Sequence, residues 1–185
     1  MVSEYLTNLE LRNQVKKTAM VSIIPIFFIL FYLIKFTSEI IVGLFTIFMI
    51  SASFFISVLI LSGCFQMFYI SQLHCLAISL VYAFGAHNVF VFYNIWNQAE
   101  SLIPEFTENI EMRLAYTFRR SKKSLELSEG TTVIGFLALG FTRINSIQSF
   151  SVYLAFIIAL NTFLSLIYLP CLVILMEARR LEKLK

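Results

Sequence analysis

The chain has 185 residues, of which 59% are hydrophobic, and its formal net charge is +3 at pH 7. A soluble domain of this size leaves about a third of its surface in water, so composition excludes a single soluble globular domain. The basic residues gather at the ends of apolar segments, where they contact anionic lipid headgroups, so the positive charge does not indicate nucleic-acid binding. All eleven acidic residues are Glu, and the three Cys residues include no CxxC pair.

Three apolar segments in the first half of the chain predict transmembrane helices. The first covers 18–34 and lies between lysines. The stretch from Ile40 to Ala99 contains no Asp, Glu, Lys or Arg, and it is long enough to cross a bilayer twice at about 20 residues per crossing. A turn at 63–72 separates a second span over 40–61 from a third span over 73–96.

An amphipathic helix and two more spans are expected in the second half. After Pro104 the first half of the helix carries Glu residues and the second half carries Arg and Lys residues, which complements the helix dipole. Apolar residues recur there every three or four positions, as in helices that lie in the headgroup region. The segment 125–142 predicts a short fourth span, and 150–176 predicts a fifth.

The predicted fold class is therefore an all-α, multi-pass membrane protein with five transmembrane helices and one amphipathic interfacial helix. Of the fourteen Lys and Arg residues, most lie on the side that carries the amphipathic helix and the C-terminus. The positive-inside rule places that side in the cytoplasm or matrix and the N-terminus on the extracytoplasmic side. The expected divisions are an N-terminal segment at 1–17, three spans within 18–99, the cytoplasmic-side helix at 100–124, two spans within 125–176 and a basic tail at 177–185.

The residue pattern of the third span is similar to a known membrane family. Gly85-Ala86-His87-Asn88, followed by Val89-Phe90-Val91-Phe92, resembles the fourth transmembrane helix of eukaryotic resistance-nodulation-division (RND) proteins of the Dispatched and Patched group. In that group a glycine precedes paired aspartates and a Val-Phe-Val-Phe run. Downstream, Arg113 to Arg120 resembles the family's cytosolic amphipathic helix, and Thr131-Thr132 resembles the start of its fifth span.

This colinear resemblance implies spans two to six of one RND half-transporter, a region similar to a sterol-sensing domain. It also implies membrane lipid or sterol as the ligand and other membrane subunits as partners, because whole transporters of this kind have two related halves. In the family, acids on the fourth span carry the driving proton or cation.

The positions that match those acids are His87 and Asn88, with Asn94 a further position that is often acidic in Dispatched-like members. Asn keeps the hydrogen bonding of Asp but does not bind and release a proton at accessible pH. His87 titrates near neutral pH in water, whereas burial in hydrocarbon favours its neutral form. It is therefore either proton-linked or a neutral residue that hydrogen-bonds to another helix, and the relay is interpreted as degenerate.

Other polar and small residues within the spans have structural interpretations. Helix packing is expected at four positions, namely Gly85, Thr131, Gly135 and Asn161. Glu126 and Glu129 form either a cation or polar site or the solvated start of a helix. The sequence has no Ser-His-Asp arrangement, phosphate loop or metal motif, so we expect no enzyme, cofactor or metal site.

Two functions from different classes follow from these observations. The first is a partial half-transporter related to lipid or sterol transport that acts only with partner subunits. The alternative is a non-transporting structural or accessory subunit of a larger membrane complex, whose relay positions have lost their acids.

Overall fold

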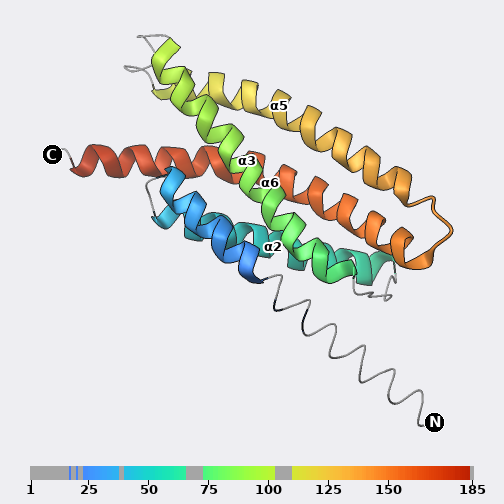
Figure 1. Ribbon diagram of the computed structural model, residues 1–185. Helices are drawn as coiled ribbons and strands as arrows, with labels where there is room; N and C mark the ends of the chain where they lie inside the picture. The colour runs from blue at the N-terminus through green and yellow to red at the C-terminus, as the bar shows by residue number, and fades with distance from the viewer. Residues whose placement is uncertain are drawn as a thin grey trace.

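The computed structural model in Figure 1 describes residues 17, 20, 23–37, 40–65, 73–102 and 110–183. Regular structure in this part of the chain is entirely helical, which confirms the expected all-α class. The labelled helices are α2 (Ile40–Phe65), α3 (Leu73–Leu102), α5 (Ile110–Leu139) and α6 (Asn145–Lys183). A shorter apolar helix, Ile23–Thr37, precedes α2.

Three of the described helices are long and apolar enough to cross a bilayer, namely α2, α3 and α6. A helix satisfies its own backbone hydrogen bonds, so an apolar helix is stable in a solvent that offers none. Large hydrophobic side chains, such as Phe48 and Phe55 on α2, remain exposed on its outward side. This distribution is typical of helices that face lipid, and the chain is an integral, multi-pass membrane protein.

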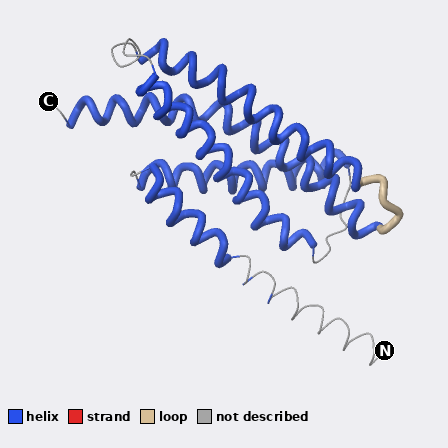
Figure 2. The backbone as a smooth tube through the Cα atoms, turned by 45° about the horizontal axis from the view of Figure 1, so that its top comes forward, coloured by secondary structure: helices blue, strands red, loops and turns tan. Residues whose placement is uncertain are grey.

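The helices form three layers, and the middle layer is the pair α3 and α6. α3 and α6 contact each other, and each also contacts α2 and α5. Between α2 and α5 the described residues make no contact, so the pair α3 and α6 separates them. Figures 1 and 2 show α5 and α6 side by side near the connection that joins them, and the two helices diverge toward the C-terminus of α6.

Helix α5 differs from the expected arrangement, because one continuous helix covers the region where a surface helix and a separate span were expected. Between 110 and 139 the only helix-weakening residues are Gly130 and Gly135, and single glycines are tolerated within a helix. The basic residues from Arg119 to Lys123 are exposed, whereas every fourth residue faces inward. That buried stripe consists of Arg113, Thr117, Ser121, Leu125 and Glu129.

Two apolar clusters make up the core. One joins Phe92 and Trp96 of α3 to Leu169 and Val173 of α6, with Leu33 from the first helix. The other joins Val81 of α3 to α6 through a set of buried aliphatic side chains, which includes Leu154, Ile157 and Ile158. Four buried polar residues on α2, α3 and α6 are linked by hydrogen bonds, namely Ser53, Asn88, Asn161 and Ser165, which we call the polar layer.

Several expected features fall wholly or partly outside the described residues. These are the N-terminal segment 1–17, the start of the first span, most of the turn at 63–72, and the beginning of the amphipathic helix with Pro104. At the other end, α6 is longer than the span expected at 150–176 and includes Pro170 within its length. The expected basic tail at 177–185 continues this helix as far as Lys183.

Candidate functional site

Gly85 lies where α3 closely approaches α2 and α6. A Cβ atom added at this glycine would overlap the side chain of Ile50 on α2 and would lie 3.2 Å from the amide nitrogen of Asn161 on α6. Only a residue without a side chain fits where the three helices meet. Small residues are used in this way at membrane helix contacts, where packing supplies much of the association energy.

Next to Gly85, the polar layer connects the same three helices by hydrogen bonds. The Asn88 side-chain amide donates to the Ser165 hydroxyl over 3.3 Å. The Ser53 hydroxyl donates to the side-chain oxygen of Asn161 over 3.3 Å. Ser165 in turn donates to the backbone carbonyl of Asn161 over 2.8 Å. Inter-helix bonds of this kind contribute on average about 0.6 kcal/mol in a membrane host, so the layer orients the helices more than it stabilises them.

The polar layer retains unused hydrogen-bonding capacity. The side-chain oxygen of Asn88 and the side-chain nitrogen of Asn161 have no hydrogen-bond partner among the described residues, although both residues are buried. One group is an acceptor and the other is a donor. An unsatisfied buried polar group costs about 1–3 kcal/mol, so both atoms favour any polar group that reaches them.

The expected relay pair is divided between two faces of α3. Asn88 is 0% exposed, whereas the adjacent His87 is exposed on the outer side of the helix. Asn94, two turns further along, is also exposed. His87 and Asn94 therefore form a polar strip on the outer face of an apolar helix, and the three candidate relay positions do not form one site within this chain.

Thr131 and Gly135, expected at helix contacts, lie on the exposed side of α5. A Cβ atom at Gly135 would meet no described atom within 4 Å, and the Thr131 hydroxyl donates to the carbonyl of Ser128 on its own helix over 2.8 Å. Within the described part of the chain, neither residue therefore has the expected packing role. The residues from Thr131 to Gly140 are apolar or small on every side of the helix. The sequence alone therefore does not show which side of α5 faces inward there.

Glu126 and Glu129 also have opposite surroundings. The Glu126 side chain is 57% exposed, and its carboxylate lies 3.6 Å from the ammonium of Lys122. Glu129 is only 2% exposed, and neither of its carboxylate oxygens has a hydrogen-bond partner among the described residues. Neither residue is therefore at the start of a helix, because α5 begins at Ile110, and only Glu126 is solvated.

Arg113 is a structural residue whose role is not evident from its position in the sequence. Its guanidinium lies 3.9 Å from the centre of the Trp96 ring and donates to the Trp96 carbonyl over 3.0 Å and to the Glu100 carboxylate over 2.7 Å. The residue is 5% exposed. It joins the start of α5 to the end of α3. No spacing rule predicts this contact, because the two helices approach only in the folded bundle.

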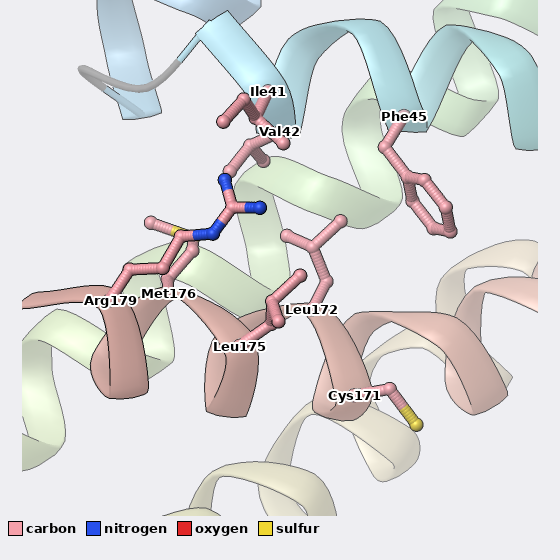
Figure 3. A pocket seen from close by; sticks show the side chains of 8 residues that line it. All are labelled: Ile41, Val42, Phe45, Cys171, Leu172, Leu175, Met176 and Arg179. Carbon is pink, nitrogen blue, oxygen red and sulfur yellow. The ribbon is translucent and has the colours of Figure 1, made fainter. Parts of the chain in front are cut away.

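Figure 3 shows an apolar pocket between the first turns of α2 and the last third of α6. Its volume is about 140 Å³, and Phe45, Leu172 and Leu175 are among its apolar walls. The Arg179 guanidinium extends over one end, toward Ile41 and Val42. The pocket offers an apolar surface with one cation at its edge, and it lies away from the polar layer.

The described residues contain no cluster of three His, Cys, Asp or Glu side chains that could hold a metal ion. The described side chains therefore offer polar hydrogen-bonding groups and apolar surface. Together with the long apolar helices, these features define a multi-pass membrane protein.

Comparison with known families identifies the class more closely. Residues 16–185 match the family model described as the sterol-sensing domain of SREBP cleavage-activation. The chain belongs to this sterol-sensing domain family, and the resemblance noted in the third span is confirmed.

Three curated relatives show the same relationship by sequence identity. The chain is 26% identical to human Protein dispatched homolog 1 over 156 residues, or 83% of this chain, and 25% identical to the mouse protein of that name over 154 residues, also 83%. It is 26% identical to Protein dispatched of Drosophila melanogaster over 125 residues, or 57% of this chain. Each match covers 10% of the relative, so the chain spans about a tenth of the length of these proteins.

Proposed function

We propose that this chain is a partial half-transporter of the RND type, related to lipid or sterol transport, which acts only with partner subunits. Its basic end, which carries Arg179 and the start of α5, faces the cytoplasm or matrix in this proposal, and its N-terminus faces the extracytoplasmic side. The supporting observation is the outer face of α3. There His87 and Asn94 are exposed on a helix with no charged residue before Glu100.

Polar side chains that face lipid at membrane depth are costly and usually face a neighbouring helix or an aqueous cavity. No other described helix covers His87 or Asn94, because both are exposed in the folded chain. A partner helix on this face would remove both residues from lipid. The proposed partner is another membrane protein, one of whose helices covers this face of α3.

The apolar pocket and the family membership support lipid or sterol as the ligand. The pocket walls are almost entirely hydrocarbon, which suits an acyl chain or a sterol ring, and Arg179 at the edge suits a polar headgroup. The whole cargo path would require the partner, because the described pocket has a volume of only about 140 Å³.

One observation favours the alternative function, a non-transporting structural or accessory subunit. The positions that match the family's acids are neutral, and they lie on two faces of α3 rather than in one site. A subunit without ion coupling would tolerate this arrangement. The nature of the partner distinguishes the two functions.

Site-specific photo-crosslinking tests the proposal. A photoreactive amino acid at position 87 or 94 should form adducts with one membrane protein in the purified native assembly. Mass spectrometry of the adduct should identify a companion with seven or more spans and a large outer domain. Adducts with several unrelated subunits would support the accessory role instead.

Phe55 provides a matched control, because it is 65% exposed on α2 and is apolar. The photoreactive group at position 55 should react mainly with lipid. If positions 87 and 94 also give only lipid adducts, the outer face of α3 is not a partner interface and the proposal fails.

A further inference from the structure

Glu129 is the buried charged residue that neither the resemblance nor the polar layer explains. It is 2% exposed, and both carboxylate oxygens are without a hydrogen-bond partner in the described part of the chain. It lies at the inner end of the buried stripe of α5, nineteen residues after Ile110, which is about 28 Å along the helix axis at ~1.5 Å per residue. The carboxyl group is therefore inside the bundle and far from the start of its helix.

The antiparallel register of α5 and α6 places Glu129 at the level of the polar layer. A Cβ atom at Gly140, just after α5, would lie 3.1 Å from a methyl group of Val152 on α6. Glu129 lies as many residues before Gly140 as Phe163 lies after Val152, so Glu129 and Phe163 are at the same level. Phe163 is within one turn of Asn161. Asn161 is also the residue whose side-chain nitrogen has no partner among the described residues and lies beside Gly85 of α3.

Among the described residues, no charged group on the neighbouring helices balances a carboxylate at this level. In the described part of α3 the charged residue is Glu100, which forms an ion pair with Arg113 at the start of α5. The first charged residue of α6 is Glu177, near its C-terminus. On its own helix, Lys122 and Glu126 face outward and pair with each other.

The uncharged titratable side chains of α3 and α6 have other surroundings. Tyr82 bonds to Ser51 of α2, and Tyr93 bonds to Met176. His87 faces outward, His74 contacts the Tyr153 ring, and Tyr168 lies in the apolar cluster with Trp96.

We infer that Glu129 is a proton-binding site inside the bundle and that its carboxyl group is protonated at neutral pH. The proton leaves only when water, or a hydrogen-bond donor that moves into the bundle, reaches the carboxyl group. A carboxylate without a charge partner is strongly disfavoured in an apolar interior, whereas the neutral acid is both a donor and an acceptor. Protonation forms one O–H bond between a carboxylate oxygen and a proton from water, and no other reactant is needed.

Use of this site in ion coupling rests on the proposed transport function. In that case Glu129 on α5 would supply the titratable acid that α3 lacks at His87, Asn88 and Asn94. Protonation itself does not depend on transport, so the two claims can fail separately. If Glu129 is protonated in an assembly that moves no lipid, the proton-binding site is supported and its role in ion coupling is excluded.

Infrared difference spectroscopy of the purified chain in lipid nanodiscs measures protonation directly, because a protonated carboxyl group has a carbonyl stretch that a carboxylate lacks. We expect this band at pH 7, where exposed glutamates are ionised. It should disappear in Glu129→Gln and persist in Glu126→Gln, the exposed control. Absence of the band in the unmodified chain at pH 7, or its persistence in Glu129→Gln, would overturn the inference.

Folding of the variants is a second readout. Gln and Met are uncharged and close in size to protonated Glu, so both Glu129→Gln and Glu129→Met should fold and elute from a sizing column like the unmodified chain. If both variants fail to fold while Glu126→Gln folds, the ionised carboxylate is structurally required. That result would also overturn a neutral Glu129.

Discussion

At the scale of single residues, one step along α3 separates two chemical environments. Asn88 is enclosed by three helices and donates to Ser165, while His87 faces outward. The polar residues of the inner face organise the bundle, and those of the outer face remain available to a partner. A substitution at either position should therefore affect a different property, namely folding for Asn88 and assembly for His87.

Gly85→Leu should destabilise the chain, because its side chain would collide with Ile50 and approach Asn161. Overpacking of this kind costs about 1–3 kcal/mol, and more where the backbone must move. Thermal unfolding in detergent measures the loss. Gly135→Leu is the matched control and should unfold like the unmodified chain, since nothing described lies within 4 Å of its Cβ position. Equal stability of both variants would show that α3 does not approach α2 closely at Gly85.

The identity of the polar residues could be predicted from the sequence, but their direction could not. In a soluble helix the polar side faces water, whereas α3 is apolar both where it meets other helices and where it meets lipid. Nothing in the pattern around positions 85–94 indicates that Asn88 points inward and His87 outward. Close helix approach at Gly85 is predictable, because small residues within apolar helices commonly serve this purpose. Its neighbours in the fold, Ile50 and Asn161, are distant in sequence.

At the scale of helices, the contact between α3 and α5 depends on Arg113. The guanidinium stacks on Trp96 and bonds to both a backbone carbonyl and the Glu100 carboxylate, so one side chain joins two helix ends. Its planar group with several donors suits this combination, which a lysine would not reproduce.

Arg113→Gln should weaken the contact between the start of α5 and the end of α3. The loss of charge-assisted hydrogen bonds and of the cation–π contact should cost about 2–3 kcal/mol. Hydrogen exchange should accelerate in the first turns of α5. The matched control is Arg120→Gln, because Arg120 is exposed and bonds to Tyr116 of its own helix. Similar exchange in both variants would mean that Arg113 does not hold the helices together.

The positions of the apolar helices could be predicted because a long run without charged residues is typical of a membrane span. The expected spans at 40–61 and 73–96 lie within α2 and α3, and the span at 150–176 lies within α6. The continuity of α5 could not be predicted, since its exposed basic residues make 110–124 resemble a separate surface helix. The buried stripe that ends at Glu129 becomes evident only when α3 and α6 are in place.

At the scale of the whole molecule, the basic side chains gather at one end of the bundle. Arg113 and the C-terminal turns of α6 lie at this end, whereas Arg143 lies in the connection between α5 and α6 at the other end. This asymmetry is the basis of the proposed orientation, with the basic end in the cytoplasm or matrix.

Cysteine labelling tests the orientation. In a background without native cysteines, Lys122→Cys should react with an impermeant reagent only from the cytoplasmic or matrix side, because Lys122 is half exposed beside the basic end. Arg143→Cys should react only from the opposite side. Reversed labelling of the two positions would contradict the proposed topology.

The chain spans about a tenth of the length of its Dispatched relatives, and partner subunits supply the other surfaces for transport only in the proposed function. The exposed polar strip on α3 and the apolar pocket between α2 and α6 are the features through which it would contribute. Both belong to a membrane-embedded bundle that is ordered by its polar layer and by the Arg113 contact.

Reconstitution in liposomes shows directly whether the chain moves lipid only together with its partners. Movement of a fluorescent sterol or phospholipid between leaflets, or to acceptor vesicles, is measured in liposomes that contain the chain alone, its purified partners alone, or both together. We expect movement only when both are present, with a loss of rate when His87 and Asn94 on the outer face of α3 are replaced by Leu. Lipid movement by the chain alone, or an intact assembly that moves neither sterol nor phospholipid, would contradict this expectation.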